Sequence, residues 1–280
     1  MKADHPLQTL CAVLAVSPSG YYAWCQRRDP PNPRALAEHT LTGRITAICA
    51  ESRHTYGRPR VPQALRQQGH RQARKPGARI MRTQGLCGRQ KGRYRVQTTQ
   101  SHHDQPIAPN HLAAAAPPTG PNQIWVADIT YIETRDGWLY LAAVLDLYSR
   151  KIVGWAMSHR MDTALVVQAL AMACLHRQPP VKILCHSDRG VQYAAADYRR
   201  QLALAGAVAS MSRKGNGYDN ATMESFWSTL KWELIYRRDF TSHDQARTEI
   251  FDYSECFYNP KRLHSALNFR SPVDFETKNN

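Results

Sequence analysis

Apolar and polar residues alternate over 124–133, and this segment begins a second half of the chain that differs from the first. Two more β-rich runs follow after short breaks, at 138–148 and 151–158, which predicts an antiparallel meander of three strands. Helical patterns then follow at 163–177, 194–205, 219–236 and 242–258, and strand-like patterns lie between them at 181–185 and 208–211. A meander followed by alternating elements predicts an α/β fold, with a mixed sheet flanked by helices.

The first 100 residues carry helical patterns instead, at 7–14, 34–51, 61–67 and 78–83, and no convincing strand. The sequence Ser17-Pro18-Ser19-Gly20 is expected to break a helix. Residues 101–122 contain five prolines and four consecutive alanines, a composition typical of linkers. We therefore expect a helical region over 1–100, a linker over 101–122, and the α/β domain with a C-terminal helical tail over 123–280.

The positive charge lies in the first half of the chain. Lys and Arg number 37 against 22 Asp and Glu, and residues 1–120 have a net charge of +13 whereas 121–280 have only +2. Nine basic residues and no acidic one lie between Arg71 and Arg95. Such an excess is expected on a surface that binds a polyanion, and nucleic acid is the commonest. A solvated charged face is the alternative, but nine charges of one sign favour DNA, with Arg79 and Arg82 as contacts.

Membrane, disulfide and zinc sites are not expected from the sequence. No apolar run approaches the roughly 18 residues that a membrane-spanning helix needs. The seven cysteines form no C-x-x-C pair, and an odd number cannot all be paired within one chain, which favours a reducing cytoplasm. His102-His103 has no paired cysteines of the kind that complete a zinc site, so zinc is not predicted.

Three acidic residues lie where a carboxylate is costly or well placed for chemistry. Asp128 interrupts an apolar strand, and burying a bare carboxylate there is unfavourable. Asp188 ends the next buried strand, at the edge where open α/β sheets carry their sites. Glu224 lies on the predicted long helix, and Lys231 follows seven residues later on the same face. The sequence motifs of P-loop nucleoside triphosphatases, zinc proteases and serine hydrolases are absent from the sequence.

Each acid alone has a structural explanation, because Asp128 or Asp188 can pair with an arginine and Glu224 can face solvent. Brought together, three carboxylates repel one another unless divalent cations neutralise them, and an oxygen-only ligand set suits Mg²⁺ or Mn²⁺. Two such ions can activate a water or a 3′-hydroxyl at a phosphodiester. Lys231 is within reach of a neighbouring phosphate. The combination predicts an enzyme that cuts or joins DNA.

Five stretches carry a resemblance to a known family: 125–131, 145–150, 186–193, 210–231, and Tyr258-Asn259-Pro260-x-Arg262-x-His264-x-x-Leu267. They cover most of 121–280, and 35 residues separate Asp188 from Glu224. In these stretches the chain resembles the orfB-type transposases of bacterial insertion sequences, whose transposase is encoded in two overlapping frames. The resemblance implies an RNase H-like fold similar to retroviral integrase cores. It also implies that Asp128, Asp188 and Glu224 are metal-binding catalytic acids of a DD(35)E motif, with Lys231 as the basic residue that follows.

The N-terminal half resembles the same family more loosely, at 19–24, 56–60 and 79–86. The resemblance implies a helix-turn-helix-like segment there. Pro76 falls where relatives usually run a helix, so it either lies in the first turn or shortens the helix. The C-terminal motif with Tyr258, Arg262 and His264 matches as well, but no role for it follows from the sequence.

Residues beside the acids have two interpretations each. Arg189, Arg213 and Lys214 are expected to contact phosphates, with a solvated surface role as the alternative. His186 and Asn220 adjoin the acids, and they are as well placed to orient a carboxylate as to touch DNA.

Asp146 lies beside Arg150, and a structural ion pair between them is favoured over a role in supporting the site. Three tryptophans are expected in the core rather than as platforms for bases: Trp155, Trp227 and Trp232.

These features predict a DNA transposase subunit that binds element ends and catalyses Mg²⁺-dependent strand cleavage and strand transfer. The resemblance implies that the upstream frame supplies another helix-turn-helix and a leucine zipper, in a fused, oligomeric protein of the bacterial cytoplasm that joins the nucleoid when bound. Two alternatives remain. A non-catalytic, domesticated DNA-binding protein would not need all three acids, and a general RNase H-like nuclease would cleave DNA without joining it.

Overall fold

The computed structural model describes residues 6–28, 33–70, 74–86, 88, 105–213 and 220–279. The chain divides into two compact units, Met1–Gly88 and Arg89–Asn280. Within the described ranges, every helix is too short or too polar to span a lipid bilayer.

The described part of the N-terminal unit is helical, with α1 (Leu7–Val13), α2 (Pro18–Arg28), α3 (Pro33–Glu51), α4 (Val61–Gln67) and α5 (Arg74–Thr83). The helices predicted at 7–14, 34–51 and 61–67 are confirmed to within one residue. A break between helices lies at 14–17, but the predicted break extended through Gly20, whereas Pro18 already begins helix α2, which was not predicted. The Ser17 hydroxyl accepts the Gly20 N–H at 3.0 Å, and Pro18 occupies the first helical position, where its missing N–H is not needed.

The core of this unit forms where α3, α4 and α5 meet. Ile45, Val61, Leu65 and Ile80 are buried there. α5 begins at Arg74, about one turn earlier than the sequence indicated, and Pro76 lies within its first turn. A proline is tolerated at that place because the first N–H groups of a helix have no partner within it.

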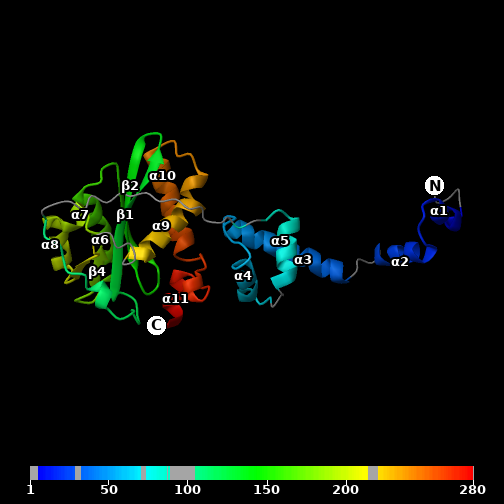
Figure 1. Cartoon of the computed structure of the whole chain (residues 1–280), viewed down its shortest axis with the longest axis horizontal. Coiled ribbons are helices and arrows are strands. Elements are labelled where there is room, and N and C mark those ends of the chain that lie inside the picture. Colours follow the sequence, from blue (N-terminus) through cyan, green and yellow to red (C-terminus); the bar gives the residue numbers. More distant parts are fainter. Residues whose placement is uncertain are drawn as a thin grey trace. The chain divides into compact units, whose positions relative to one another are not determined.

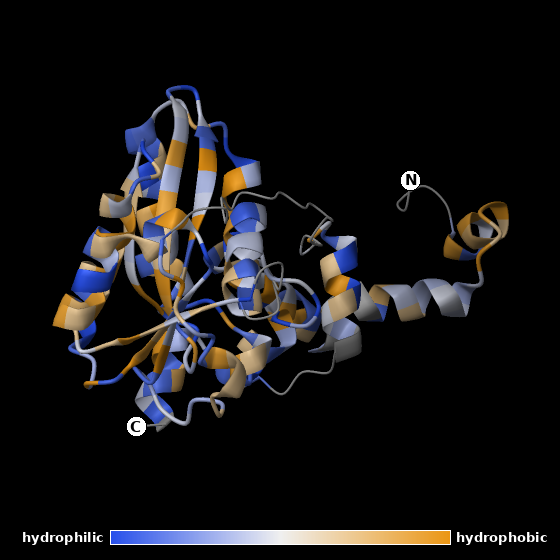
Figure 2. Ribbon diagram, turned by 60° about the vertical axis from the view of Figure 1, so that its left-hand side comes forward, coloured by the Kyte–Doolittle hydropathy of each residue, from blue (hydrophilic) through white to orange (hydrophobic). Residues whose placement is uncertain are grey.

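A five-stranded mixed sheet forms the centre of the C-terminal unit, as predicted. Its strands are β1 (Ile124–Thr134), β2 (Gly137–Asp146), β3 (Ile152–Ser158), β4 (Leu184–Ser187) and β5 (Val208–Met211), in the order β3-β2-β1-β4-β5. β1 pairs antiparallel with β2 and β2 with β3, whereas β1 and β5 pair in parallel with β4. The turn between the two long strands β1 and β2 is hydrophilic (Figure 2).

Helices cover both faces of this sheet (Figure 1). On one face α6 (Thr163–Arg177), α7 (Val191–Ala194) and α8 (Ala196–Leu204) enclose a core with β-strand residues such as Trp125 and Ala127. The other face of β1 contacts α9 (Ala221–Glu233) and α10 (His243–Phe251). Because side chains alternate along β1, residues 126, 128, 130 and 132 point toward α9 and α10.

A close approach of β3 to α6 requires glycine at position 154. A Cβ added there would lie 2.3 Å from the carbonyl oxygen of Ala169 and 2.6 Å from the backbone nitrogen of Ala173. No side chain fits such a gap, so Gly154 sets the packing distance between the edge strand and the helix.

Several predicted boundaries move in this unit. β4 lies about two to three residues later than the predicted strand at 181–185. Lys182 has a φ of 71°, which is outside the strand region, and its N–H is bonded to the carbonyl of Gly206, so the strand begins only after it. The helix predicted at 194–205 is confirmed as α8 to within two residues, and the short helix α7, which ends just before Ala195, was not predicted.

The helix predicted at 219–236 ends at Glu233 and continues as the 3₁₀ turn η3 (Ile235–Arg237). The one predicted at 242–258 is α10 followed by the π-helix η4 (Asp252–Tyr258). The C-terminal tail adds η5 (Ser265–Leu267) and α11 (Pro272–Asn279).

The predicted linker is described from Gln105 onward, and this part lies on the C-terminal unit. It contains the 3₁₀ turn η1 (Leu112–Ala114). The N–H groups of His111 and Leu112 contact the hydroxyl of Ser210 in β5, at 3.0 and 3.3 Å.

Candidate active site

Parallel pairing of β1 with β4 brings Asp128 and Asp188 together. Ala127 lies opposite Ser187 in the last pair of this ladder, so the next residue on each side is an acid on the same face of the sheet. Both carboxylates line one cavity of about 30 Å³. A water needs about 10–15 Å³, so the cavity has room for a water or a metal ion.

The Asp128 carboxylate accepts two hydrogen bonds, from the Trp227 Nε1–H at 2.9 Å and from the backbone N–H of Ile129 at 2.9 Å. Burial raises the pKa of Asp128 to about 7, and the negative charges of Asp188 and Glu224 act in the same direction. The two hydrogen bonds oppose this rise. The site therefore concentrates negative charge that its own donors do not fully balance.

Asp188 is held by the turn that follows β4. Its Oδ1 accepts the backbone N–H of Gly190 at 2.9 Å. A Cβ at Gly190 would lie 3.0 Å from the same oxygen, so glycine leaves room for the carboxylate to receive this bond. The side chain is thereby oriented by the backbone of its own loop.

Glu224 lies in the first turn of α9 with an exposed side chain. Trp227 follows it by three residues, so the bond from Trp227 to Asp128 fixes α9 to β1 close to Glu224. Glu224 is near enough to affect the pKa of Asp128. Among the described residues, however, no group of three His, Cys, Asp or Glu side chains is arranged to hold a metal ion. The structure thus brings Asp128 and Asp188 together and places Glu224 nearby.

Lys231 lies beside the acids, further along α9. Its Nζ is 4.7 Å from the centroid of the Tyr131 ring in β1, a cation–π contact. Partial burial lowers the pKa of Lys231, and the charge of Asp128 opposes that change. The Lys231 ammonium and the Glu224 carboxylate therefore both lie within electrostatic range of Asp128.

His186 and Asn220, predicted to orient a carboxylate or touch DNA, both have buried side chains. The His186 Nδ1 lies 2.8 Å from the Ser210 hydroxyl, which directs the ring toward β5. Asn220 caps the start of α9 without a side-chain capping bond, and its Oδ1 has no hydrogen-bond partner among the residues described.

The expected phosphate contacts are found in different surroundings. Arg189 is half-buried, and its Nε donates to the carbonyl of Ser212 at 2.7 Å. Arg213 is exposed, and Lys214 lies outside the described residues. In the N-terminal unit, Arg79 pairs with Glu38 at 2.7 Å, and Arg82 is exposed in the last turn of α5.

The predicted ion pair between Asp146 and Arg150 is wrong. Asp146 is fully buried and accepts the backbone N–H groups of Asn122, Tyr148 and Ser149, at 2.6, 2.9 and 3.2 Å. These bonds from the surrounding turns satisfy the carboxylate. The Arg150 guanidinium donates instead to the Thr222 hydroxyl in α9, at 2.8 Å.

The sequence did not reveal that Trp227 contacts an acid of the site. Its burial confirms the predicted core position, whereas Trp155 and Trp232 are only half-buried. The available signal was the spacing from Glu224, because residues three apart on a helix share a face. Once Glu224 is taken as a residue of the site, this spacing predicts that the Trp227 indole lies beside it.

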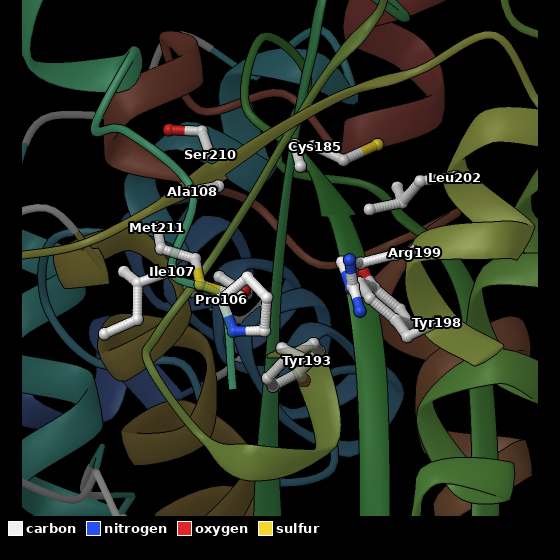
Figure 3. A pocket seen from close by; sticks show the side chains of 12 residues that line it. Pro106, Ile107, Ala108, Cys185, Tyr193, Tyr198, Arg199, Leu202, Ser210 and Met211 are labelled. Atoms are coloured by element: carbon white, nitrogen blue, oxygen red, sulfur yellow. The ribbon is translucent and has the colours of Figure 1, made fainter. Parts of the chain in front are cut away.

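A second cavity of about 130 Å³ lies beside β4, β5 and α8. Figure 3 shows Pro106, Met211 and Tyr193 at its wall. Tyr193 borders both cavities, and its buried hydroxyl has no hydrogen-bond partner in the described part of the chain. Burial raises the pKa of Tyr193, and the charge of Asp128 adds to the effect.

Models of known families match most of the chain. An integrase core domain matches residues 118–217, a second integrase core domain model matches 205–272, and an HTH-like domain matches 36–94.

Full-length relatives match as well. The chain is 44% identical to the insertion element IS600 31 kDa protein of Shigella sonnei, over 96% of this chain and 98% of that protein. It is 41% identical to transposase InsF for insertion sequence IS3A of Escherichia coli K12, over 99% of this chain and 96% of the relative. Among solved structures, a chain of the simian T-cell lymphotropic virus intasome in complex with the PP2A regulatory subunit B56 gamma matches with a TM-score of 0.48 and 14% identity, over 76% of this chain and 69% of that one.

Proposed function

Since this chain belongs to the transposases of bacterial insertion sequences, we propose that Asp128, Asp188 and Glu224 carry DNA strand cleavage and strand transfer with Mg²⁺ or Mn²⁺. One observation carries the assignment to these residues. The β1–β4 register places Asp128 and Asp188 side by side at the end of the ladder, with Glu224 of α9 within electrostatic range.

The chemistry of the donors fits a divalent cation. All three side chains offer carboxylate oxygens, the ligands that Mg²⁺ and Mn²⁺ prefer. The raised pKa of Asp128 indicates negative charge that a cation would balance. When bound, such ions supply a more acidic attacking hydroxyl and a stabilised leaving oxygen. Closure of Glu224 onto Asp128 and Asp188 would complete the ligand set.

The other residues of the site position these groups. The Trp227 indole holds Asp128 in one orientation, and the Gly190 N–H holds Asp188. Lys231 and Arg189 supply positive charge at the edge of the site, where they would bind the phosphates beside the scissile bond. The predicted products are a free 3′-hydroxyl after attack by water, and a joined strand after attack by that hydroxyl.

Binding of the element ends belongs to the N-terminal unit in this proposal. Its HTH-like match and the basic segment around Arg79 and Arg82 support that role. We further propose that the active protein is an oligomer on DNA, joined to the helix-turn-helix product of the upstream frame. Sequencing the DNA that flanks the reading frame supplies both the upstream frame and the terminal repeats needed as substrate.

The test compares DNA cleavage and DNA binding in the same variants. Asp188→Asn and Glu224→Gln are expected to abolish strand cleavage and strand transfer on DNA carrying the terminal repeats, while gel-shift affinity stays within about twofold of wild type. Asp197→Asn is the matched control, because Asp197 is an exposed acid of α8 in the same unit. Cleavage at the wild-type rate by either acid variant would refute the assignment. Strand-transfer products distinguish a transposase from a nuclease that only cleaves.

A further inference from the structure

The C-terminal motif holds the helix that carries Glu224 and Lys231. Arg262 forms a bidentate ion pair with Glu233 in the last turn of α9: its Nε donates to Oε2 at 2.8 Å and its Nη2 to Oε1 at 2.7 Å. Only 4% of the Arg262 side chain and 12% of the Glu233 side chain are exposed. A fork-to-fork pair of this kind fixes direction as well as distance.

Two more side chains complete this buried cluster. The Tyr253 hydroxyl donates to Glu233 Oε2 at 2.9 Å. The His264 ring lies with its Nε2 3.3 Å from Arg262 Nη1, and it packs edge-on against Tyr258 with 4.9 Å between the ring centroids. Both oxygens of Glu233 are therefore engaged, from η4 and from the segment after it.

The same motif contacts the middle of α9, and Arg150 contacts its beginning. The Tyr258 ring packs against Phe226, with 4.9 Å between the ring centroids. Arg150, which interacts electrostatically with Tyr258, donates to Thr222 in the first turn of α9 at 2.8 Å. The helix is thus held near its start, its middle and its end.

Asn259 connects this arrangement to the sheet. Its Oδ1 accepts the N–H of Ile152 and its Nδ2 donates to the carbonyl of Ile152, both at 2.9 Å. Ile152 begins β3, which is an edge strand. The segment from Tyr258 to Arg262 therefore joins the edge of the sheet to the far side of α9.

Helix geometry relates this contact to the site. Glu233 follows Glu224 by nine residues, which is about 2.5 turns, so the two side chains point to opposite sides of α9. Lys231 follows Glu224 by seven residues and shares its face. Fixing Glu233 from behind therefore sets the rotation of α9, and that rotation determines where the Glu224 carboxylate and the Lys231 ammonium point.

We propose that Arg262 and Glu233, supported by Tyr253 and Tyr258, position α9 so that Glu224 can join Asp128 and Asp188 in binding a divalent cation. These are positioning residues, and the inference rests on the proposed function of the three acids. A pair that served folding alone would gain little from its charges, because apolar residues of similar volume often stabilise a buried site equally well. A bidentate pair adds orientation, and a misplacement of about 1 Å at a reacting group costs on the order of 100-fold in rate.

The test is Arg262→Lys in the full chain, which keeps the charge but loses the fork. Mn²⁺ binding is measured without DNA, from the electron paramagnetic resonance signal of the free ion, and cleavage is measured as kcat and KM. We expect Mn²⁺ affinity and kcat to fall by about 10- to 100-fold, as for other residues that support metal ligands. KM for DNA should stay within about twofold.

Arg177→Lys is the matched control. Arg177 makes an equally bidentate pair with Glu276, both bonds being 2.9 Å, and its side chain is 15% exposed. This pair joins α6 to α11 and does not involve α9. The control should lower the thermal stability of the unit while leaving the Mn²⁺ affinity of the folded protein unchanged. Equal losses of Mn²⁺ affinity in both variants, or none in Arg262→Lys, would overturn the proposal.

A milder variant covers the case in which Arg262→Lys does not fold. Tyr253→Phe removes one hydrogen bond to Glu233 and keeps the ring, and it should weaken Mn²⁺ binding by about threefold. An unchanged affinity in this folded variant would count against the inference. Glu224→Gln distinguishes a failure of the proposed function from a failure of the positioning inference. If it leaves cleavage intact, the proposed function fails. If it abolishes cleavage while Arg262→Lys and Tyr253→Phe bind Mn²⁺ like wild type, only the positioning inference fails.

Discussion

Arginine serves different purposes in the two units of this chain. In the N-terminal unit, where acids are scarce, Arg66, Arg79 and Arg82 have exposed side chains, and even the pair of Arg79 with Glu38 is about half exposed. In the C-terminal unit, Arg262 is buried and Arg177 is mostly buried, and each forms a bidentate pair with a glutamate. Residue type by itself therefore does not predict contact with DNA. The local supply of acids decides whether an arginine faces a polyanion or fixes the fold.

The largest effect is expected at Asp128, a half-buried acid of the C-terminal unit whose carboxylate accepts hydrogen bonds from an indole and from a backbone N–H. Asp128→Asn keeps an oxygen that can accept the Trp227 N–H but removes the negative charge that would bind a cation. Strand cleavage should fall on the order of 10³-fold or more, which corresponds to about 4 kcal/mol in activation free energy. DNA affinity, which we assign to the N-terminal unit, should not change in a gel-shift assay. Retained cleavage would remove Asp128 from the proposed site.

The same substitution should stabilise the metal-free protein. The pKa of Asp128 in the folded state, about 7, lies above the value of about 3.9 in an unfolded chain. The folded state therefore binds the proton more tightly, and the free energy of unfolding falls as the pH rises from about 4 to 7. Asp128→Asn removes this loss. In EDTA at pH 8 its free energy of unfolding should exceed that of wild type by about 1 to 3 kcal/mol, and at pH 4 the difference should disappear. Urea titrations at both pH values measure it, and a gain that persists at pH 4 would contradict this cause.

Two glycine substitutions, one in each unit, are expected to change the stability of the two units in opposite directions. In Gly154→Ala, the new methyl group meets the backbone of α6, so the C-terminal unit should lose about 1 to 3 kcal/mol of unfolding free energy. Gly43→Ala is the counterpart in α3, where nothing lies within 4 Å of the added Cβ, and it should gain about 0.5 to 1 kcal/mol because alanine favours a helix. Hydrogen exchange read segment by segment should show each change in its own unit. A loss of protection in α3 caused by Gly154→Ala would show that the units unfold together.

The sequence predicted those parts of the fold that periodicity and short turns control. The meander β1–β3, helix α6 and strand β5 follow from local patterns, and so do the positions of Asp128 within a strand and of Asp188 directly after the next buried strand. Helix α2 was missed because Ser17 and Pro18 occur both in turns and at helix starts, and only the bond from Gly20 to Ser17 distinguishes the two.

Contacts between distant segments were beyond the sequence patterns. The partner of Asp146 was misassigned because a neighbouring arginine is visible in sequence, whereas the N–H of Asn122, which is 24 residues away, is not. The role of Arg262 likewise depends on Glu233, 29 residues earlier, and on the rotation of α9. Such pairs join segments that are far apart in the sequence, so residue spacing alone does not indicate them.

DNA affinity should depend on the exposed arginines of the N-terminal unit. Arg79→Gln combined with Arg82→Gln should weaken binding to the element ends on the order of tenfold, and should reduce the slope of log K against log salt by about 1.8 if each contacts one phosphate. The double substitution Arg200→Gln and Arg247→Gln removes two charges from the surface of the C-terminal unit, where both arginines pair with nearby aspartates. It serves as the control in salt-dependent gel shifts. Equal weakening by the two double variants would show that binding follows net charge and not one unit.

The smallest effect is expected for the hydrogen bond from Trp227 to Asp128, which joins a buried side chain of α9 to an acid of the proposed site. Trp227→Phe keeps most of the buried ring but removes the N–H that Asp128 accepts. Losing this bond should raise the pKa of Asp128 further, because the bond favours the charged form. The kcat of cleavage should therefore fall about threefold to fivefold at neutral pH, about 1 kcal/mol, and part of the loss should be recovered at higher pH. Trp155→Phe removes an equivalent bond, from Nε1 to Glu255 at 2.8 Å, away from the acids. If both variants lose activity with the same pH dependence, the indole acts through packing, and orientation of Asp128 must come from the backbone of β1 alone.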